Sequence, residues 1–339
     1  MTKLPLLGKT LSELKNIAVE LGMPAFTGKQ LSDWIYKKRI TSIDEMSNIS
    51  LQNRNLLNEK YEIGRSIPVE SQVSVDGTIK YLFRTHKNQF IESVYIPEED
   101  RATLCVSSQV GCKMNCLFCM TGKQGFSSQL TPTEIINQYY SIPESEKLTN
   151  IVFMGMGEPM DNLDNLLTSL EIMTSDYGMG WSPKRITVST IGILPKMISF
   201  LEKSTCHLAV SMHTPFADER LKLMPVQKAY PIESVIEELK KHDFSKQRRV
   251  SFEYIMFNGL NDTMRHAIAV VKLLKDIPCR VNLIRYHKIP EIDLDSSDEA
   301  RMVSFRDYLT NNGVMTTIRK SRGEDIFAAC GMLSSLKHS

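Results

Sequence analysis

The amino-acid sequence predicts an α/β protein, an incomplete (βα)6 TIM-like barrel with an N-terminal helical accessory domain. From about residue 101 onward, short apolar segments typical of strands alternate with segments typical of helices. The expected strands are 102–107, 150–155, 185–190, 207–213, 250–256 and 280–285. The region before them instead carries three helix-start patterns and then a hairpin signal. This order of signals predicts both the parallel sheet and the appended domain.

The composition indicates a globular protein. Of the 339 residues, 42% are hydrophobic, and the formal net charge of +2 does not by itself indicate a nucleic-acid binder. No segment approaches the ~20 apolar residues of a membrane span, and the N-terminus lacks a signal-peptide pattern. Seven cysteines, three of them clustered, favour a reducing compartment with thiol or metal chemistry over a disulfide scaffold. We therefore expect a cytoplasmic protein with no membrane partner.

Three local basic groups are candidate RNA contacts, although each alone is more often a solvated surface. They are Lys37, Lys38 and Arg39; Lys246, Arg248 and Arg249; and Arg319, Lys320 and Arg322.

Residues 1–65 are expected to form the helical accessory domain. Capping-box patterns begin at Thr10, Thr27 and Ser42, each followed three residues later by Glu or Gln. Such a domain is either a packing appendage or an RNA-binding module, and the sequence does not separate the two.

Residues 66–100 are expected to form a β-hairpin extension that links to the core. Asp76-Gly77 is a hairpin turn signal, and a second strand follows near residue 90. This strand contains Glu92, although carboxylates in strands usually face solvent.

Residues 101–313 form the expected barrel, and residues 314–339 a last strand and a tail that carries Cys330. Within the barrel, Thr131 is followed by Pro132 and Glu134, which predicts a helix start with Thr131 as the N-cap. Functional sites in parallel sheets lie at the carboxyl ends of the strands, which is where the loop after the first strand is placed.

That loop contains Cys112, Cys116 and Cys119 at the spacing C-x3-C-x2-C. Thiolates at this spacing can converge on a soft metal centre. A cubane held by three thiolates leaves one iron open for a small molecule. The alternatives are a zinc site with a distant fourth ligand, or a chance run of buried cysteines.

The next three strand ends carry further polar groups at the same sheet edge. Gly157 and Glu158 follow the second strand, where glycine lets a ligand approach the backbone and the carboxylate can accept from an ammonium group. Ser189 ends the third strand, and Ser211, Met212 and His213 end the fourth. Singly each could be a local cap; their repeated placement favours a ligand site.

Four cysteines lie outside the loop. Cys206 and Cys279 open apolar strands and fit buried small hydrophobes. Cys105 lies in the first core strand, and Cys330 follows a basic segment that favours thiolate.

Five segments make the chain resemble the RlmN/Cfr family of radical S-adenosylmethionine (radical-SAM) RNA adenine methyltransferases. They are CVSSQVGCKMNCLFCMTGKQGF, FMGMGEPMDN, STIGI, SMHTP with ERLKLMP, and RKSRGEDIFAACG. TGKQGF and GEP are more similar to the RlmN branch, which methylates carbon 2 of adenine, than to the Cfr branch, which methylates carbon 8.

The resemblance implies a radical-SAM barrel and a role for each candidate residue. Cys112, Cys116 and Cys119 would hold one 4Fe–4S cluster; Gly157, Glu158, Ser189, Ser211, Met212 and His213 would bind SAM; Cys330 would accept a methyl group, Cys105 would resolve the enzyme–RNA adduct, and Glu92 would accept a proton. His287 stands where the family typically has a SAM-contacting asparagine.

The resemblance also implies the reaction. Two SAM molecules are used per turnover, one to methylate Cys330 and one as the source of a 5′-deoxyadenosyl radical, and a Cys105–Cys330 disulfide must then be reduced. The implied substrates are an adenosine in the peptidyl-transferase centre of 23S rRNA and an anticodon-loop adenosine of tRNA. A low-potential electron donor and a disulfide reductant are implied partners. Alternatives are the carbon-8 reaction, a radical-SAM protein activase or maturase, and a non-catalytic iron–sulfur protein.

Overall fold

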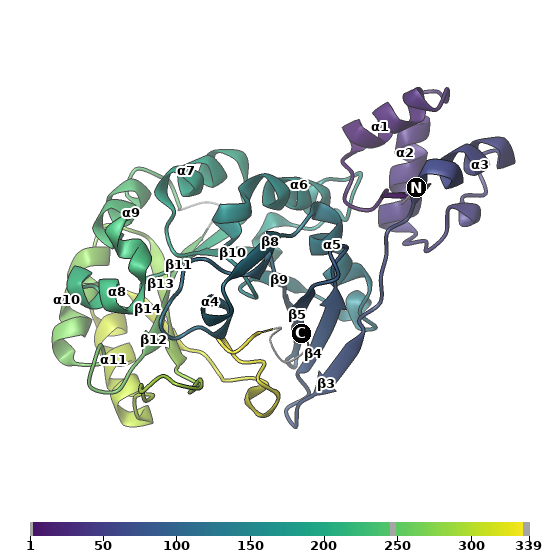
Figure 1. Ribbon diagram of the computed structural model, residues 1–339. Helices are drawn as coiled ribbons and strands as arrows, with labels where there is room; N and C mark the ends of the chain where they lie inside the picture. Colours follow the sequence, from purple (N-terminus) through teal and green to yellow (C-terminus); the bar gives the residue numbers. More distant parts are fainter. Residues whose placement is uncertain (1–2, 245–248, 335–339) are drawn as a thin grey trace.

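The structure is a computed structural model, which describes residues 3–244 and 249–334. Lys246 and Arg248 of the second basic group lie outside the described residues. A curved sheet with helices on its outer side forms the body, and a small helical domain lies at one end of it (Figure 1).

Ten strands form the main sheet, in the order β14-β13-β12-β11-β10-β9-β6-β5-β4-β3. Neighbours from β14 to β6 are parallel, as alternating strands and helices predict. The bounds are β6 Ala102–Cys105, β9 Asn150–Phe153, β10 Ile186–Thr190, β11 His207–Ser211, β12 Val250–Met256, β13 Cys279–Arg285 and β14 Met315–Ile318. All six expected core strands are confirmed, most ending or beginning one or two residues inside their predicted bounds.

An antiparallel extension continues the sheet beyond β6. It comprises β3 Glu70–Val73, β4 Ile79–Arg84 and β5 Phe90–Pro97. The β3–β4 hairpin turns at Asp76-Gly77, where Gly77 has φ +83°, so the turn signal is confirmed. β5 pairs with both β4 and β6, which makes the extension part of the same sheet.

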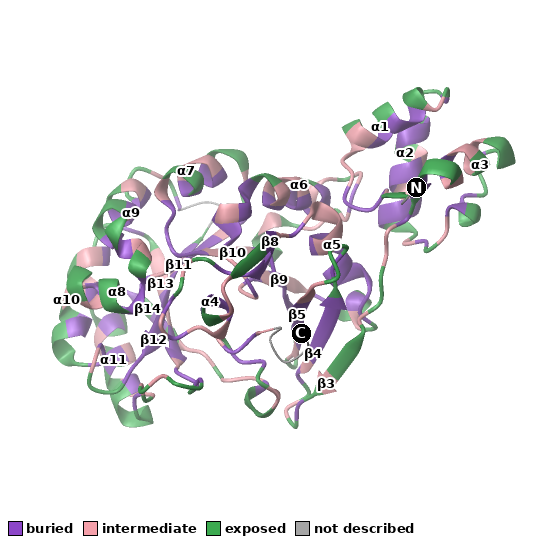
Figure 2. Cartoon of the chain, viewed as in Figure 1, coloured by how far each residue is buried: buried purple, intermediate pink, exposed green. Residues whose placement is uncertain are grey.

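Helices cover the outer side of the parallel strands, and their sheet-facing sides are buried while their outer sides are exposed (Figure 2). They are α5 Pro132–Tyr140, α6 Leu163–Thr174, α7 Leu194–Lys203, α8 Ala217–Leu223, α9 Ile232–Leu239, α10 Met264–Leu274 and α11 Glu299–Asn311. The expected N-cap of α5 is confirmed, because the Thr131 side chain accepts from the Glu134 amide and the Glu134 carboxylate accepts from the Thr131 amide.

The N-terminal domain contains α1 Leu11–Glu20, α2 Thr27–Ser32, α3 Leu51–Lys60 and a parallel pair of short strands, β1 Leu4–Pro5 and β2 Tyr61–Glu62. Capping boxes are present at Thr10 and Ser42. The expected box at Thr27 is wrong: Thr27 is itself helical, because its amide already donates to Pro24 in a turn that starts earlier.

This domain contacts the barrel at the start of α5. Gly8 has φ +84°, and a β-carbon there would lie 2.4 Å from the Thr133 nitrogen. The Thr133 hydroxyl donates to the Leu7 carbonyl at 2.7 Å. Only glycine permits this approach, so the position of the domain depends on Gly8.

Candidate functional site

The three-cysteine loop lies directly after β6, at the carboxyl end of the parallel sheet. Two short strands enclose it, β7 Gln109–Gly111 and β8 Phe126–Gln129, which pair antiparallel. A short helix, α4 Met120–Gln124, starts immediately after Cys119. Cys112 and Cys116 are buried and Cys119 is partly buried.

The thiols of this loop suit a metal cluster rather than free thiolates. Burial raises the pKa of Cys112 to about 12 and raises the pKa values of Cys116 and Cys119. A bound metal centre would offset this cost by holding the sulfurs as thiolates. Within residues 3–244 and 249–334, no three Cys, His, Asp or Glu side chains are placed to hold a single metal ion. A cubane differs from a single ion, because each thiolate binds a different iron and the sulfurs need not meet at one point.

A cavity of about 150 Å³ connects this loop with the strand ends. Of the residues expected to bind SAM, Gly157, Glu158, Ser189, Ser211 and His213 line it together with all three loop cysteines. Met212 is fully buried and is not among the lining residues. The cavity therefore combines a soft ligand set with hydroxyl, carboxylate and imidazole groups, which is a donor set that fits an iron–sulfur cluster and an amino acid–nucleoside ligand.

Glu158, which follows β9, is held by the end of β10. Its carboxylate accepts from the Thr190 hydroxyl at 2.6 Å and from the Ile191 amide at 3.0 Å. Burial raises the pKa of Glu158 to about 7, although these hydrogen bonds act in the opposite direction. An ammonium ligand would favour its charged form.

His213 is neutral in this site. Burial, with the Arg220 guanidinium, lowers its pKa to about 3. Its Nδ1 accepts from the Ile255 amide at 3.0 Å, which leaves the proton on Nε2 as a donor. The ring packs edge-on against Phe118 of the cysteine loop, with centroids 4.8 Å apart.

Cys105 and Cys330 meet at a second, smaller cavity of about 80 Å³. Cys105 is buried on β6 and Cys330 is exposed on the C-terminal tail; both are free thiols. Cys330 also lines the first cavity, and Cys119 lines both. Cys105 and Cys330 are 225 positions apart in the sequence, yet they border one cavity beside the three-cysteine loop.

Hydrogen bonds from the cysteine loop hold the tail in this position. The Met120 amide donates to the Gly331 carbonyl at 2.8 Å, and the Thr121 hydroxyl donates to the Leu333 carbonyl at 2.7 Å. Figure 1 shows α4 beside the yellow C-terminal segment.

Arg319 and Glu253 are lining residues that the sequence interpretation did not assign to the site. Arg319, at the end of β14, lines both cavities, and its Nη1 lies 3.5 Å from Glu253 Oε2. Cys330, Glu253 and Cys105 raise the pKa of Arg319 despite its burial. The available signal for Glu253 was a carboxylate inside an apolar strand; its register opposite Ser211 places it at the cavity.

Glu92 is buried on β5 and lines neither cavity. Its Oε1 lies 3.1 Å from Lys80 Nζ, and its Oε2 accepts from the Ser334 amide at 2.9 Å. The tail that carries Cys330 therefore also reaches Glu92.

His287 is not brought to the first cavity. Its ring is buried, and Nδ1 lies 3.3 Å from Glu324 Oε1.

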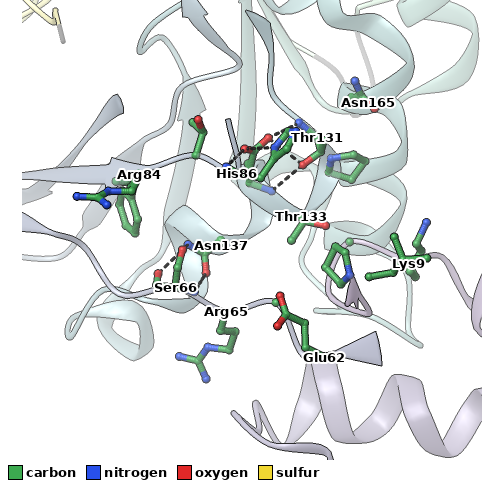
Figure 3. Close-up of a pocket in the computed structure, with 18 of the residues that line it drawn as sticks. Lys9, Glu62, Arg65, Ser66, Arg84, His86, Thr131, Thr133, Asn137 and Asn165 are labelled. Atoms are coloured by element: carbon green, nitrogen blue, oxygen red, sulfur yellow. Dashed lines mark hydrogen bonds and ion pairs between the residues drawn. The ribbon is translucent and has the colours of Figure 1, made fainter. Parts of the chain in front are cut away.

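A cavity of about 1110 Å³ lies elsewhere, between the N-terminal domain and the barrel. Figure 3 shows residues of both parts around it, with the chain segment of Glu62 and Arg65 facing the start of α5. Lys9 is paired with Glu13, and His86 with Glu134. No cysteine lines this cavity, so the thiol chemistry is confined to the other two.

Comparison with known proteins gives two family matches. Residues 4–63 match the ribosomal RNA large subunit methyltransferase N-terminal domain, and residues 106–271 match the radical SAM superfamily.

Curated relatives match along nearly the whole chain. A protein of Phocaeicola vulgatus described as "Probable dual-specificity RNA methyltransferase RlmN" is 62% identical over 335 residues, which are 99% of this chain and 96% of the relative. The "Dual-specificity RNA methyltransferase RlmN" of Desulfotalea psychrophila is 39% identical, covering 98% of this chain and 95% of its own.

A crystal structure of a radical SAM methyltransferase from Sphaerobacter thermophilus superimposes with a TM-score of 0.92 at 35% identity, over 98% of this chain and 99% of that one. The expected radical-SAM barrel with its accessory domain is confirmed.

Proposed function

The chain belongs to the RlmN family, and from that premise we propose that it is a radical-SAM methyltransferase acting on carbon 2 of adenosine in RNA. The proposed substrates are an adenosine of the peptidyl-transferase centre of 23S rRNA and an anticodon-loop adenosine of tRNA. The observation that carries the proposal is the position of Cys330, which borders both the three-cysteine loop and Cys105.

Cys112, Cys116 and Cys119 would hold a 4Fe–4S cluster, and the strand-end residues Gly157, Glu158, Ser189, Ser211 and His213 would bind SAM. When bound, SAM would supply a methyl group, and the cluster with SAM would supply a radical able to take a hydrogen atom from that methyl group.

The chain's own residues carry the methyl group to the base. The Cys330 sulfur accepts it and presents it as a thioether, so one difficult substitution becomes two easier steps. Once the carbon is joined to adenine, Glu92 takes the ring proton. Cys105 then attacks the Cys330 sulfur; the sulfur–carbon bond breaks, its electron pair stays on the carbon, and that carbon takes up a proton to become the product methyl. The one unpaired electron that radical addition leaves on the adduct would pass to the bound cluster as its acceptor.

The product state of the protein is a Cys105–Cys330 disulfide. A thiol reductant must reopen it before the next turnover, and a low-potential donor must reduce the cluster. Both free thiols and the shared cavity are compatible with this cycle. An enzyme with disulfide chemistry that needs a reductant at each turnover suits the cytoplasm. No helix of the described residues is long and apolar enough to cross a bilayer.

We keep the predicted domain bounds, with residues 1–65 as the helical accessory domain, 66–100 as the hairpin extension, 101–313 as the barrel and 314–339 as the methyl-carrying segment. Of the two readings of residues 1–65, we propose the one in which this domain contacts RNA.

The decisive test is anaerobic reconstitution followed by incubation with SAM, a reductant and a 23S rRNA fragment, with mass spectrometry of the digested nucleosides. The expected product is 2-methyladenosine. Mainly 8-methyladenosine would move the chain to the carbon-8 reaction, and SAM cleavage without any methylated nucleoside would favour an activase.

A further inference from the structure

Glu92 and Lys80 form a buried ion pair on the face of the sheet that carries Cys105. Lys80 pairs with Val94 in the β4–β5 register, and Val94 pairs with Cys105 in the β5–β6 register. Residues paired across strands point to the same face, and Glu92, two positions from Val94, shares that face. The proposed proton acceptor, the resolving cysteine and Lys80 therefore lie on one side of three adjacent strands.

The ion pair is almost completely withdrawn from solvent. The Lys80 and Glu92 side chains are 10% and 2% exposed, and Nζ lies 3.1 Å from Oε1. A lysine is rarely buried to this degree unless it is paired with an acid. Burying two charges costs free energy that their attraction offsets only in part, so this ion pair need not stabilise the folded protein. Replacing a buried ion pair by apolar residues of similar volume is often neutral or stabilising, so stability alone does not explain why this pair is present.

The two oxygens of Glu92 have different partners. Oε1 faces the ammonium of Lys80, which belongs to a strand. Oε2 accepts from the Ser334 amide, which belongs to the tail that also carries Cys330. Movement of the tail would withdraw the Ser334 amide from Oε2 while Lys80 stays beside Oε1.

We propose that Lys80 is a positioning residue for the methyl transfer, which holds Glu92 in its charged form and orients Oε2 toward the adenine ring proton. The inference rests on the proposed function. In the step it serves, the ring C–H bond breaks, the electron pair stays on the ring, and an O–H bond forms on Glu92. Lys80 touches neither substrate nor reacting atoms; its ammonium offsets the cost of a carboxylate in a dry site.

The described groups that face Glu92 give the sign of the pH dependence. They are Lys80 from β4 and the Ser334 amide from the tail, and the Cys105 thiol from β6 lies on the same face of the sheet. Burial raises the pKa of Cys105 to about 12, so this thiol stays neutral below that pH. Loss of the Lys80 charge would make Glu92 hold its proton up to higher pH, and proton removal would then need more alkaline conditions.

The test isolates proton removal from product release. In a Cys105→Ala background, the RNA adduct on Cys330 forms but is not resolved. A 23S rRNA fragment carrying tritium at adenine carbon 2 reports proton removal as tritium release, followed in single turnover between roughly pH 5 and pH 9. Lys80→Met, Lys80→Gln and Lys80→Arg are compared, with Lys87→Met, at an exposed turn lysine of the same hairpin, as the matched control.

In Lys80→Met and Lys80→Gln, the acidic limb of the plot of tritium-release rate against pH should move to higher pH by about one to three units. At the alkaline end, the tritium-release rates of these variants should approach that of the parent protein. Lys80→Arg and Lys87→Met should follow the parent protein, and Glu92→Gln should release no tritium. If Lys80→Met does not fold, Lys80→Gln keeps a hydrogen-bond donor without the charge.

A rate lowered equally at every pH, or an unchanged profile in both uncharged variants, overturns the role of Lys80. The proposed function survives either result, because Cys330 methylation and adduct formation are measured in the same samples. Absence of an adduct and of tritium release in the parent protein overturns both.

Discussion

Cys330 lies between two different sets of thiols. On one side lies Cys119 of the three-cysteine loop, and on the other lies Cys105, which is buried in a strand. A carrier sulfur that must first receive a methyl group and later be attacked by a second thiol needs access to both sides.

The two cysteines should therefore fail in different ways. Cys330→Ala should abolish RNA methylation, because the carrier atom is gone. Cys105→Ala should accumulate protein cross-linked to RNA through Cys330, visible as a nuclease-sensitive shift on a denaturing gel. Cys206→Ala, at a buried cysteine outside both cavities, is the control. Normal turnover of Cys105→Ala without a cross-link would refute the two-cysteine mechanism.

Glu158 should make the free energy of unfolding depend on pH. Its pKa of about 7 in the folded protein lies above the ordinary value of 4.5. Its contribution is therefore fully present below about pH 4.5 and is lost as the pH rises through about 7, by an amount on the order of 3 kcal/mol. Urea unfolding of the cluster-free protein at several pH values checks this. Glu158→Gln should flatten the profile over this interval; an identical pH dependence in the variant would contradict the assignment.

At the scale of elements, α4 links the cysteine loop to the tail. This short helix begins directly after Cys119, and its first two residues hold the tail through Gly331 and Leu333. Gly331 itself has φ +85°, which favours glycine at the point where the tail turns past the loop.

Thr121→Val should loosen the tail without unfolding the barrel. It removes a buried hydroxyl that donates to Leu333 and leaves that carbonyl unpaired, at a cost of about 1–3 kcal/mol. Hydrogen exchange of residues 328–334, read by mass spectrometry, should accelerate by about 5- to 150-fold, while the strands keep their protection. Thr121→Ser, which keeps the hydroxyl, should match the wild type. Equal exchange in Thr121→Val would show that this hydrogen bond does not hold the tail.

At the scale of the molecule, the N-terminal domain and the barrel enclose the large cavity shown in Figure 3. Lys3 contributes from the domain and Arg84 from the extension of the sheet, and both are exposed. Exposed cations on both sides of a groove suit a phosphodiester backbone.

Replacing Lys3 and Arg84 together by uncharged residues should weaken RNA binding to a similar degree for different RNA sequences. Each lost phosphate contact should reduce the slope of log affinity against log salt by about 1. Binding of the 23S rRNA fragment is measured across a salt series. The control neutralises Lys203 and Lys272, two exposed lysines at the ends of α7 and α10 that do not line the cavity. If both double variants show the same slope of log affinity against log salt, the groove does not contact RNA.

Local chemistry in the sequence predicted much of this protein. The strand–helix alternation, the turn at Asp76-Gly77 and the N-cap at Thr131 depend on neighbouring residues alone, and each is confirmed. The cap expected at Thr27 was wrong because a turn that begins at Pro24 already makes the backbone helical at Thr27.

What could not be predicted depends on register and on contacts between distant segments. Lys80 joins Glu92 only because β4 and β5 pair in one particular register, and a slip of one residue would turn either side chain to the opposite face. Arg319 reaches both cavities, and Cys330 approaches Cys105, only because β14 completes the sheet and the tail folds back on α4. Spacing along the chain identifies groups that share a loop, whereas groups from separate strands meet only through the packing of the whole sheet.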